Sequence, residues 1–292
     1  MTTSNVYKVL RWGTLLTSCL LFLSCAALKP ASPEARIALV VGNADYKVVS
    51  PLNNPVNDAK GMSEALKELK FEVISKENAN KETMETAIKE FETRLKEEHQ
   101  QGKKTVALFY YSGHGAQDGD ENFLLPVALN TAHDTPNTLL ESETVALSSV
   151  LDSMKDAETT MNIVILDACR NKPDNLMLAD ASGKTKSLAK GLAWVDNTAS
   201  PDSTVPEGTL IAYATSPKKE AYDDGVKNSP YTKYLLERIH ERGLSIEELF
   251  KQVRKKVIKE TEEKQTPWES SSLEGEFYFA GIKRVSPPPG FQ

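Results

Sequence analysis

The stretch of sequence that organises this chain runs from Lys104 to Cys169 and contains two apolar runs that stop abruptly. The first run, TVALFYY at positions 105–111, ends at Ser112-Gly113-His114-Gly115. The second run, NIVIL at positions 162–166, ends at Asp167-Ala168-Cys169-Arg170-Asn171. Short apolar runs without alternation indicate strands buried on both faces, as in a parallel sheet covered by helices. Ligands bind at the carboxyl ends of such strands, so we expect the function where His114 and Cys169 follow the two runs.

The rest of the chain supplies strands and helices in alternation. Four further segments are predicted to be strands: 37–41, 71–75, 208–214 and 276–279. A hairpin is predicted around 122–126, and helices are predicted over about 59–69, 84–95, 147–154, 231–242 and 245–261. This alternation, without an internal repeat, predicts one α/β domain with a mostly parallel sheet.

The N-terminus has the features of an export signal. Two basic residues precede a short apolar run over 15–25, which is too short for a comfortable transmembrane helix. The end of that run resembles the bacterial lipoprotein box, in which a cysteine after small residues is lipidated. Cys25 follows an apolar run of the right length and is the expected lipidation site, although Leu16-Thr17-Ser18-Cys19 matches the box better residue by residue. The alternatives are a leader that is simply cleaved near Ala26 and an uncleaved membrane anchor.

The expected domain organisation has four parts. Residues 1–25 form the export signal, 26–35 a linker, 36–283 the α/β domain and 284–292 a Pro-rich tail. Within the domain, residues 172–207 are expected to form an exposed loop, and loops of this length are usually functional or mobile. The 292 residues include 35 Lys and Arg against 41 Asp and Glu, with no basic stripe, which excludes the electrostatic footprint of a nucleic-acid-binding protein.

Cys169 is the one cysteine of three that lies outside the leader, so the exported domain has no pair for an internal disulfide. A lone thiol in an oxidising compartment is a liability unless it is used or buried. Burial as a small hydrophobe is common for free cysteine. However, the polar neighbours Asp167, Arg170 and Asn171 argue against a core position.

His114 and Cys169 together predict nucleophilic catalysis. A thiolate attacks a carbonyl carbon, and a nearby imidazole lowers the pKa of the thiol or protonates the leaving amine. The amides of Gly115 and Cys169 are candidates to bind the oxyanion. No zinc site is expected, because these two residues have no partners at ligand spacing. The remaining histidines lie in charged helical stretches or a loop and are expected at the surface: His99, His133 and His240.

Two motifs, YYSGHG at positions 110–115 and DACRN at positions 167–171, resemble the catalytic signatures of bacterial caspase-like cysteine peptidases, relatives of metacaspases and paracaspases. Cys169 lies 55 positions after His114, consistent with the caspase pattern of a His roughly 50 residues upstream of the Cys. Further blocks resemble the family in order: 56–59, 122–126, 208–215, 228–231 and 265–268. The resemblance covers about 36–281. It implies a three-layer sandwich with a mainly parallel six-stranded sheet between helices, with His114 as the catalytic histidine and Cys169 as the nucleophile.

The resemblance also implies cleavage after Arg or Lys. Asp167 stands two residues before Cys169, as in metacaspases, where animal caspases have Gln. Asp58, within Val56-Asn57-Asp58-Ala59, matches a second acid of the metacaspase pocket. Two carboxylates in a partly dry pocket favour a cation and bind Arg in bidentate fashion. The structural alternatives are a helix N-terminal acid for Asp58 and a loop residue that caps its own turn for Asp167.

Other features depart from the family or extend the expectation. The loop after Asn171 lacks the family's usual Pro-Phe, so contacts beyond the main pocket are not implied. Thr215 and the turn Asp223-Asp224-Gly225 are expected to line the cleft. No cofactor is required by the sequence. Many metacaspases need calcium, but the acids of this sequence form no loop motif that can be assigned to it, so calcium activation stays open. The lysines of the exposed loop are expected self-cleavage sites: Lys184, Lys186 and Lys190.

The expected function is a cysteine endopeptidase held at the bacterial cell envelope by an N-terminal lipid. Its partners are peptide or protein substrates and the membrane, not nucleic acid. One alternative is a catalytically silent caspase-like binding or scaffold module at the envelope. Pseudo-enzymes of this group usually lack the His or the Cys, and both are present here. The other alternative is a cysteine hydrolase that acts on a non-peptide amide.

Overall fold

The structure is a computed structural model that describes residues 34–130, 135–168, 177–179, 185–187, 192, 195, 205–216 and 227–283. Several residues singled out in the sequence lie outside these ranges: Cys25, His133, Cys169, Lys184, Lys190 and the turn 223–225. Within the described ranges, no helix is both long and apolar enough to cross a membrane.

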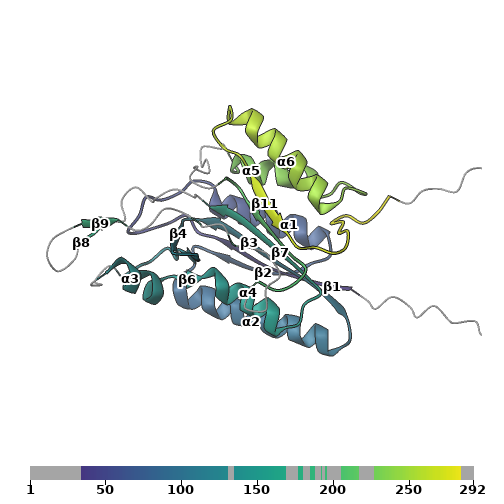
Figure 1. Ribbon diagram of the computed structural model, residues 1–292, viewed down its shortest axis with the longest axis horizontal. Helices are drawn as coiled ribbons and strands as arrows, with labels where there is room; N and C mark the ends of the chain where they lie inside the picture. Colours follow the sequence, from purple (N-terminus) through teal and green to yellow (C-terminus); the bar gives the residue numbers. More distant parts are fainter. Residues whose placement is uncertain are drawn as a thin grey trace, which may run out of the picture. The chain divides into compact units, whose positions relative to one another are not determined.

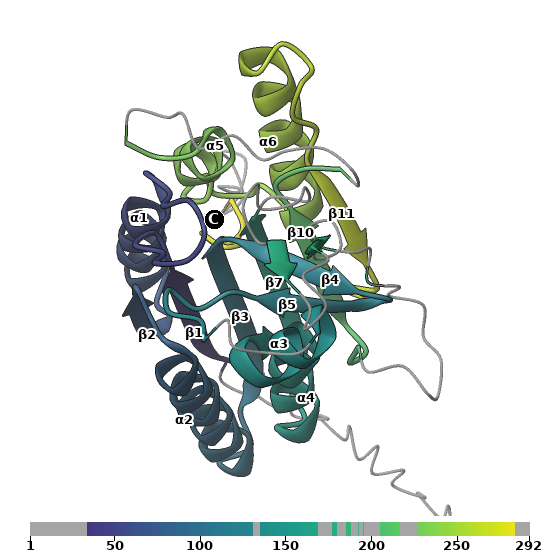
Figure 2. The same cartoon turned by 90° about the vertical axis from the view of Figure 1, so that its left-hand side faces the viewer.

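A six-stranded sheet forms the centre of the fold, in the order β11-β10-β7-β3-β1-β2. Neighbouring strands from β10 to β2 run parallel, and β11 pairs with β10 in the antiparallel direction. Figures 1 and 2 show these strands side by side. The mainly parallel sheet predicted from the sequence is therefore confirmed. The bounds are β1 (Glu34–Gly42), β2 (Glu72–Glu77), β3 (Lys104–Gly113), β7 (Met161–Ala168), β10 (Thr209–Tyr213) and β11 (Trp268–Ser271).

Helices cover both faces of the sheet, which explains the unbroken apolar runs of its central strands. Helices α1, α5 and α6 lie on one face, and α2 and α4 lie on the other (Figure 1). Every residue of β3 from Thr105 to Gly113 is buried. Because side chains alternate across a strand, Tyr110 packs into the core under α1 and α5, whereas Tyr111 packs into the core above α2 and α4. The bounds are α1 (Pro55–Glu68), α2 (Lys81–Gln100), α4 (Leu147–Asp156), α5 (Pro230–Arg238) and α6 (Ile246–Glu260).

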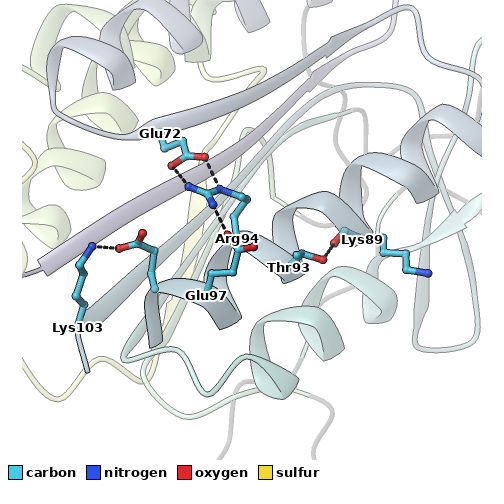
Figure 3. A network of polar contacts seen from close by, with 7 residues as sticks. Glu72, Lys89, Thr93, Arg94, Glu97 and Lys103 are labelled. Carbon is cyan, nitrogen blue, oxygen red and sulfur yellow. Dashed lines mark hydrogen bonds and ion pairs between the residues drawn. The ribbon is translucent and has the colours of Figure 1, made fainter. Parts of the chain in front are cut away.

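Helix α2 shows how the sequence encodes one of these layers. Asn80 caps its start by accepting a hydrogen bond from the amide of Thr83 at 2.8 Å, a favoured N-cap arrangement. The buried residues are those with helical spacing in the sequence: Met84, Ala87, Ile88, Phe91 and Leu95. On the outer side, Arg94 donates to both carboxylate oxygens of Glu72 in β2, at 2.7 and 2.9 Å, and also contacts Glu97 (Figure 3).

Smaller elements lie at the edges of this frame. Strands β4 (Gly115–Asp118), β5 (Glu121–Leu124) and β6 (Val145–Ala146) form an antiparallel sheet directly after His114, so the predicted hairpin is confirmed. Strands β8 (Met177–Ala179) and β9 (Thr185–Ser187) pair as a ribbon inside the segment expected to be an exposed loop. Helix α3 (Pro136–Glu143), which was not predicted, begins with a capping box at Thr135 and Thr138.

The strand predicted at 276–279 is wrong, because the edge position is filled by β11. Phe277 and Phe279 are buried in the core under α6, so their alternation imitates a strand. Their carbonyl groups bond elsewhere: that of Phe277 accepts from the Ile246 amide at 2.9 Å, and that of Phe279 accepts from Arg36 at 2.7 Å. Helix α5 also ends earlier than predicted, at Arg238.

Candidate active site

The carboxyl ends of β3 and β7 meet at one edge of the sheet. Ser112 pairs with Asp167 and Gly113 pairs with Ala168 in the parallel register. On the other side of β3, Gly42 at the end of β1 pairs with Ser112. The two signature segments predicted to carry the chemistry therefore leave the sheet from neighbouring positions.

The imidazole of His114 has a defined orientation. Its Nε2 atom lies 2.8 Å from the carbonyl oxygen of Ser50, and the residue is 6% exposed. A carbonyl oxygen only accepts hydrogen bonds, so Nε2 carries the hydrogen in this contact. In the neutral imidazole, Nδ1 then holds the lone pair and is the nitrogen that takes up a proton.

Two tyrosines hold the backbone and ring of His114. Tyr46, which follows β1, accepts a hydrogen bond from the His114 amide at 2.7 Å, and its ring lies 4.6 Å from the imidazole, centre to centre. Tyr111 donates from its hydroxyl to the carbonyl oxygen of His114 at 2.7 Å. The same carbonyl accepts from the Leu125 amide at 3.1 Å, which connects the segment to the small sheet. His114 is thus fixed from both sides of its peptide unit.

Glycine is required directly before His114. Gly113 has a φ of +156°, and a Cβ atom there would lie 2.5 Å from the Tyr46 hydroxyl and 2.7 Å from the Tyr111 hydroxyl. Such contacts do not occur without displacement of the two tyrosines. Gly115, the predicted oxyanion-binding residue, begins β4, and a Cβ atom there would lie 2.6 Å from the side chain of Leu192.

The two predicted pocket acids are buried close to each other. Asp58 is fully buried in the first turn of α1, and Asp167 is 5% exposed near the end of β7. Ser229, the N-cap of α5, contacts both: its amide donates to Oδ1 of Asp58 at 3.1 Å, and its hydroxyl donates to Oδ2 of Asp167. Asn228 adds a 2.9 Å bond to Oδ1 of Asp58. The partners that the structure describes for both acids thus come from other elements, which places the acids at a junction of α1, β7 and α5.

Burial gives Asp58 an unusual protonation equilibrium. Removal from water, and then the charge of Asp167, raise the pKa of Asp58 from 3.8 to about 8. Donors from Asn228, Ser229 and Ser112 oppose this rise but do not cancel it. The direction of this shift favours the protonated form of the Asp58 carboxyl at neutral pH.

Thr215, predicted to line the cleft, follows β10 on the far side of β7. It is fully buried, and its hydroxyl has no hydrogen-bond partner among the residues that the structure describes. The preceding residue, Ala214, donates to the Leu166 carbonyl of β7 at 2.9 Å and accepts from Gln265 at 2.9 Å. Thr215 therefore belongs to the same edge of the sheet, while its role in binding stays a prediction.

Two other predictions concern histidines and metal ions. The side chains of His99 and His240 are each 42% exposed, so their predicted surface position is confirmed. In the described part of the chain, no group of three or more His, Cys, Asp or Glu side chains is arranged to hold a metal ion. Calcium activation stays open.

Sequence reasoning missed Tyr46 and gave no role to Ser229. Tyr46 lies four residues after β1, a parallel neighbour of β3, so the rule that carboxyl ends share an edge pointed to it. Ser229 stands before a proline at a helix start, a recognisable N-cap signal. What that signal does not reveal is that the same side chain reaches Asp167.

Comparison with known proteins identifies the family to which this domain belongs. Residues 35–278 match the caspase domain family, Peptidase_C14, and the chain belongs to this family. Among curated proteins, it is 26% identical over 212 residues to mucosa-associated lymphoid tissue lymphoma translocation protein 1 of Homo sapiens, covering 70% of this chain and 22% of that protein. It is 26% identical over 143 residues to caspase-12 of Canis lupus familiaris, covering 48% and 34%, and 24% identical over 213 residues to caspase-1-A of Xenopus laevis, covering 70% and 50%.

The match to the family over residues 35–278 confirms the caspase-like family predicted from the sequence, and the mainly parallel six-stranded sheet confirms its α/β fold. The chain spans about a fifth of the human relative's length, at 22%, and about half of the frog caspase, at 50%. What is similar is the caspase domain, not the whole of the longer proteins.

Proposed function

We propose that this protein is a cysteine endopeptidase, with Cys169 as the nucleophile and His114 as the catalytic histidine, that cleaves after Arg or Lys. The observation that carries the proposal is the register of β3 and β7, in which Gly113 pairs with Ala168. His114 and Cys169 are the residues that follow this pair in the chain. Membership of the caspase domain family supports peptide hydrolysis as the reaction class.

In the proposed mechanism, the Cys169 thiolate attacks the carbonyl carbon of the cleaved peptide bond. The carbonyl oxygen becomes an oxyanion, for which the amides of Gly115 and Cys169 are the proposed donors. The imidazolium of His114 gives its proton to the leaving amine, and the resulting acyl-enzyme is then hydrolysed by water. The contact between Nε2 and the Ser50 carbonyl supports Nδ1 as the nitrogen that exchanges this proton.

The proposed preference for Arg or Lys rests on the buried acids. Among the described residues, the hydrogen bonds of Asp58 are to uncharged groups of Ser112, Asn228 and Ser229. A buried carboxylate without a cation is costly. A guanidinium group supplies both positive charge and paired N–H donors to carboxylates, so a basic substrate side chain is a suitable partner for Asp58 and Asp167.

Turnover of matched peptides tests the catalytic proposal. The purified protein would be given fluorogenic peptides that differ only in the residue before the cleaved bond: Arg, Lys, citrulline, Asp or Asn, with and without calcium. We expect turnover of the Arg and Lys peptides, none of the citrulline peptide, and none in Cys169→Ala or His114→Ala. The matched control is His240→Ala, because His240 is an exposed histidine far along the chain.

Each other outcome has a defined meaning. Cleavage after Asp or Asn keeps the nucleophile but refutes the roles of Asp58 and Asp167. Absence of turnover on every peptide, in a folded protein with calcium, favours the silent binding module instead. Turnover that persists in Cys169→Ala refutes the proposed mechanism.

We further propose that the protein is exported and held at a bacterial cell envelope by a lipid on Cys25. The support is the order of basic residues, short apolar run and cysteine at the N-terminus. Cys25→Ser is expected to move the protein from the detergent phase to the aqueous phase, and Cys19→Ser is the matched control. Retention of Cys25→Ser in the detergent phase contradicts lipidation at this residue.

A further inference from the structure

Ser229 contacts both buried acids, but it donates to each through a different group. Its amide donates to Oδ1 of Asp58 at 3.1 Å, whereas its hydroxyl donates to Oδ2 of Asp167. That hydroxyl oxygen also accepts from the Thr232 amide at 3.0 Å, as an N-cap does. The Ser229 hydroxyl therefore accepts from α5 through its oxygen and directs its hydrogen at Asp167.

The hydroxyl of Thr232 also donates to Asp167. Thr232 donates to Oδ2 of Asp167 at 2.7 Å, and its oxygen lies 2.6 Å from the Tyr110 hydroxyl. Because the Thr232 hydrogen is used on Asp167, Tyr110 is the donor to Thr232. Two O–H donors therefore converge on a single oxygen of Asp167, and bonds of this kind stabilise the charged form of a carboxyl group.

Asp58 has a different set of contacts. Its Oδ1 accepts two N–H bonds, from Asn228 at 2.9 Å and Ser229 at 3.1 Å, so this oxygen is not the one that carries hydrogen. Its Oδ2 lies 3.3 Å from the Ser112 hydroxyl, long for an O–H···O bond, whose usual length is about 2.7–2.8 Å. Of the three carboxyl oxygens of the pair whose contacts are described above, Oδ2 of Asp58 is thus the one where a proton is held at least cost.

Among the residues that the structure describes, two tyrosines are the titratable neighbours on which the two acids act. Tyr110 from β3 faces both acids, and Tyr231 from α5 faces Asp167. Burial, followed by the nearby carboxylates, raises the pKa of each tyrosine well above 10. Both tyrosines are therefore neutral at pH 7.

We propose that Ser229 is a specificity-positioning residue: it holds Asp167 as the ionised acid and leaves Asp58 with the pair's single proton, so that a cationic side chain enters by displacing that proton. This proposal rests on the proposed function of the acids as the binding site for Arg or Lys. When the cation binds, the O–H bond of Asp58 breaks, the proton goes to water, and the guanidinium takes the place of the hydrogen beside the carboxylate. One positive charge enters and one leaves.

The test measures binding without catalysis. The full-length Cys169→Ala protein would be titrated calorimetrically with N-acetyl-arginine amide in two buffers of different ionisation heat, which gives the number of protons released. With a pKa of about 8 for Asp58, about nine-tenths of the carboxyl is protonated at pH 7, so about 0.9 proton is expected to be released per ligand. Affinity should rise about tenfold from pH 6 to pH 7 and level off above pH 8.

Ser229→Ala separates positioning from a merely structural role. Without the hydroxyl, Asp167 also gains affinity for a proton, so we expect about tenfold weaker binding at pH 7 and a midpoint shifted to higher pH. Ser229→Thr restores the hydroxyl and should restore both values. The matched control is Ser245→Ala, which removes the N-cap side chain of α6 and touches neither acid.

Each remaining outcome either supports or overturns the role of Ser229 or the peptidase activity. If Ser229→Ala does not fold, Thr232→Val removes the second donor while Ser229 still caps α5, and the same shift is expected. Proton release near zero in the parent protein, or a pH midpoint unchanged in both variants, overturns the proposal. Arg-specific turnover with an unchanged midpoint refutes only the role of Ser229, whereas coupled binding without any turnover by the protein with Cys169 intact refutes only the peptidase.

Discussion

Removal of one hydroxyl group tests how firmly His114 must be held. In Tyr46→Phe, the amide of His114 loses its acceptor at 2.7 Å, while the aromatic ring still covers the imidazole. Because His114 is 6% exposed, the amide is left buried and unsatisfied, which costs about 1–3 kcal/mol. For a domain of this size, a loss of about 2 kcal/mol lowers Tm by about 4–8 °C.

The catalytic consequence is expected in kcat rather than KM. In the proposed mechanism the imidazole of His114 touches the reacting atoms, whereas the described contacts of the Tyr46 side chain are to His114, Tyr111 and Leu125 and not to the proposed substrate-binding acids. We expect kcat on the Arg peptide to fall about tenfold, equivalent to about 1.4 kcal/mol, with KM changed by less than twofold. Tyr278→Phe is the control, since its hydroxyl bonds to Glu276 at 2.6 Å away from the site. A variant that loses stability but keeps its kcat would refute the positioning role, and one that keeps both would refute the contact itself.

Three further predictions follow from single contacts. Gly113→Ala should fail to accumulate as folded protein, because its Cβ would lie 2.5 Å from the Tyr46 hydroxyl; normal expression and Tm would contradict this. Asp58 has a pKa raised to about 8 in the folded state, so the native protein binds one more proton than the unfolded chain between about pH 4 and pH 8. The free energy of unfolding should therefore fall by about 1.4 kcal/mol per pH unit across that range. Urea unfolding of Asp58→Asn should lack this pH dependence. Arg94→Ala should cost under about 1 kcal/mol, because its pair with Glu72 is partly exposed. Since Arg94 lowers the pKa of Glu72, this contribution should be present at pH 7, lost as the pH falls through that lowered pKa, and reduced in high salt; a cost that is independent of pH and salt would count against the ion pair.

The central sheet was predictable because the pattern that indicates it lies in the order of apolar residues along the chain. Residues 105–111 and 162–166 are apolar without alternation, and a strand covered by helices on both faces requires that pattern. The segment 276–279 shows the limit of the same reasoning. Its buried phenylalanines alternate as in a strand, but their backbone carbonyls bond to Arg36 and to the start of α6. Alternation indicates which side chains are buried, but it does not indicate which groups the backbone hydrogen-bonds to.

The candidate site was predictable only in part, for a related reason. His114, Asp58 and Asp167 were found because each occurs in a recognisable local motif. Ser229 lies 62 positions from Asp167 and 171 from Asp58 in the chain. Its contact with both depends on how α5 is set against the sheet, which is a property of tertiary packing rather than of local sequence.

The alternation of β3 separates the site into two halves that should respond independently. Tyr111 points to the face of α2 and α4, where it contacts Tyr46 and the carbonyl of His114. Tyr110 points to the opposite face, where it bonds to Thr232 and so supports the acids.

Because the contacts of these two halves share no side chain among the residues that the structure describes, mutations in them should be additive. Tyr46→Phe lowers kcat and Thr232→Val weakens binding of the basic side chain, so the double variant should show the product of the two single effects on kcat/KM. Thr232→Val combined with Asp58→Asn supplies the contrast, since both residues act on one shared proton and their effects should not add. A coupling energy above about 0.5 kcal/mol between Tyr46 and Thr232 would mean that the sheet transmits strain between its faces, and that His114 and the acids are not positioned separately.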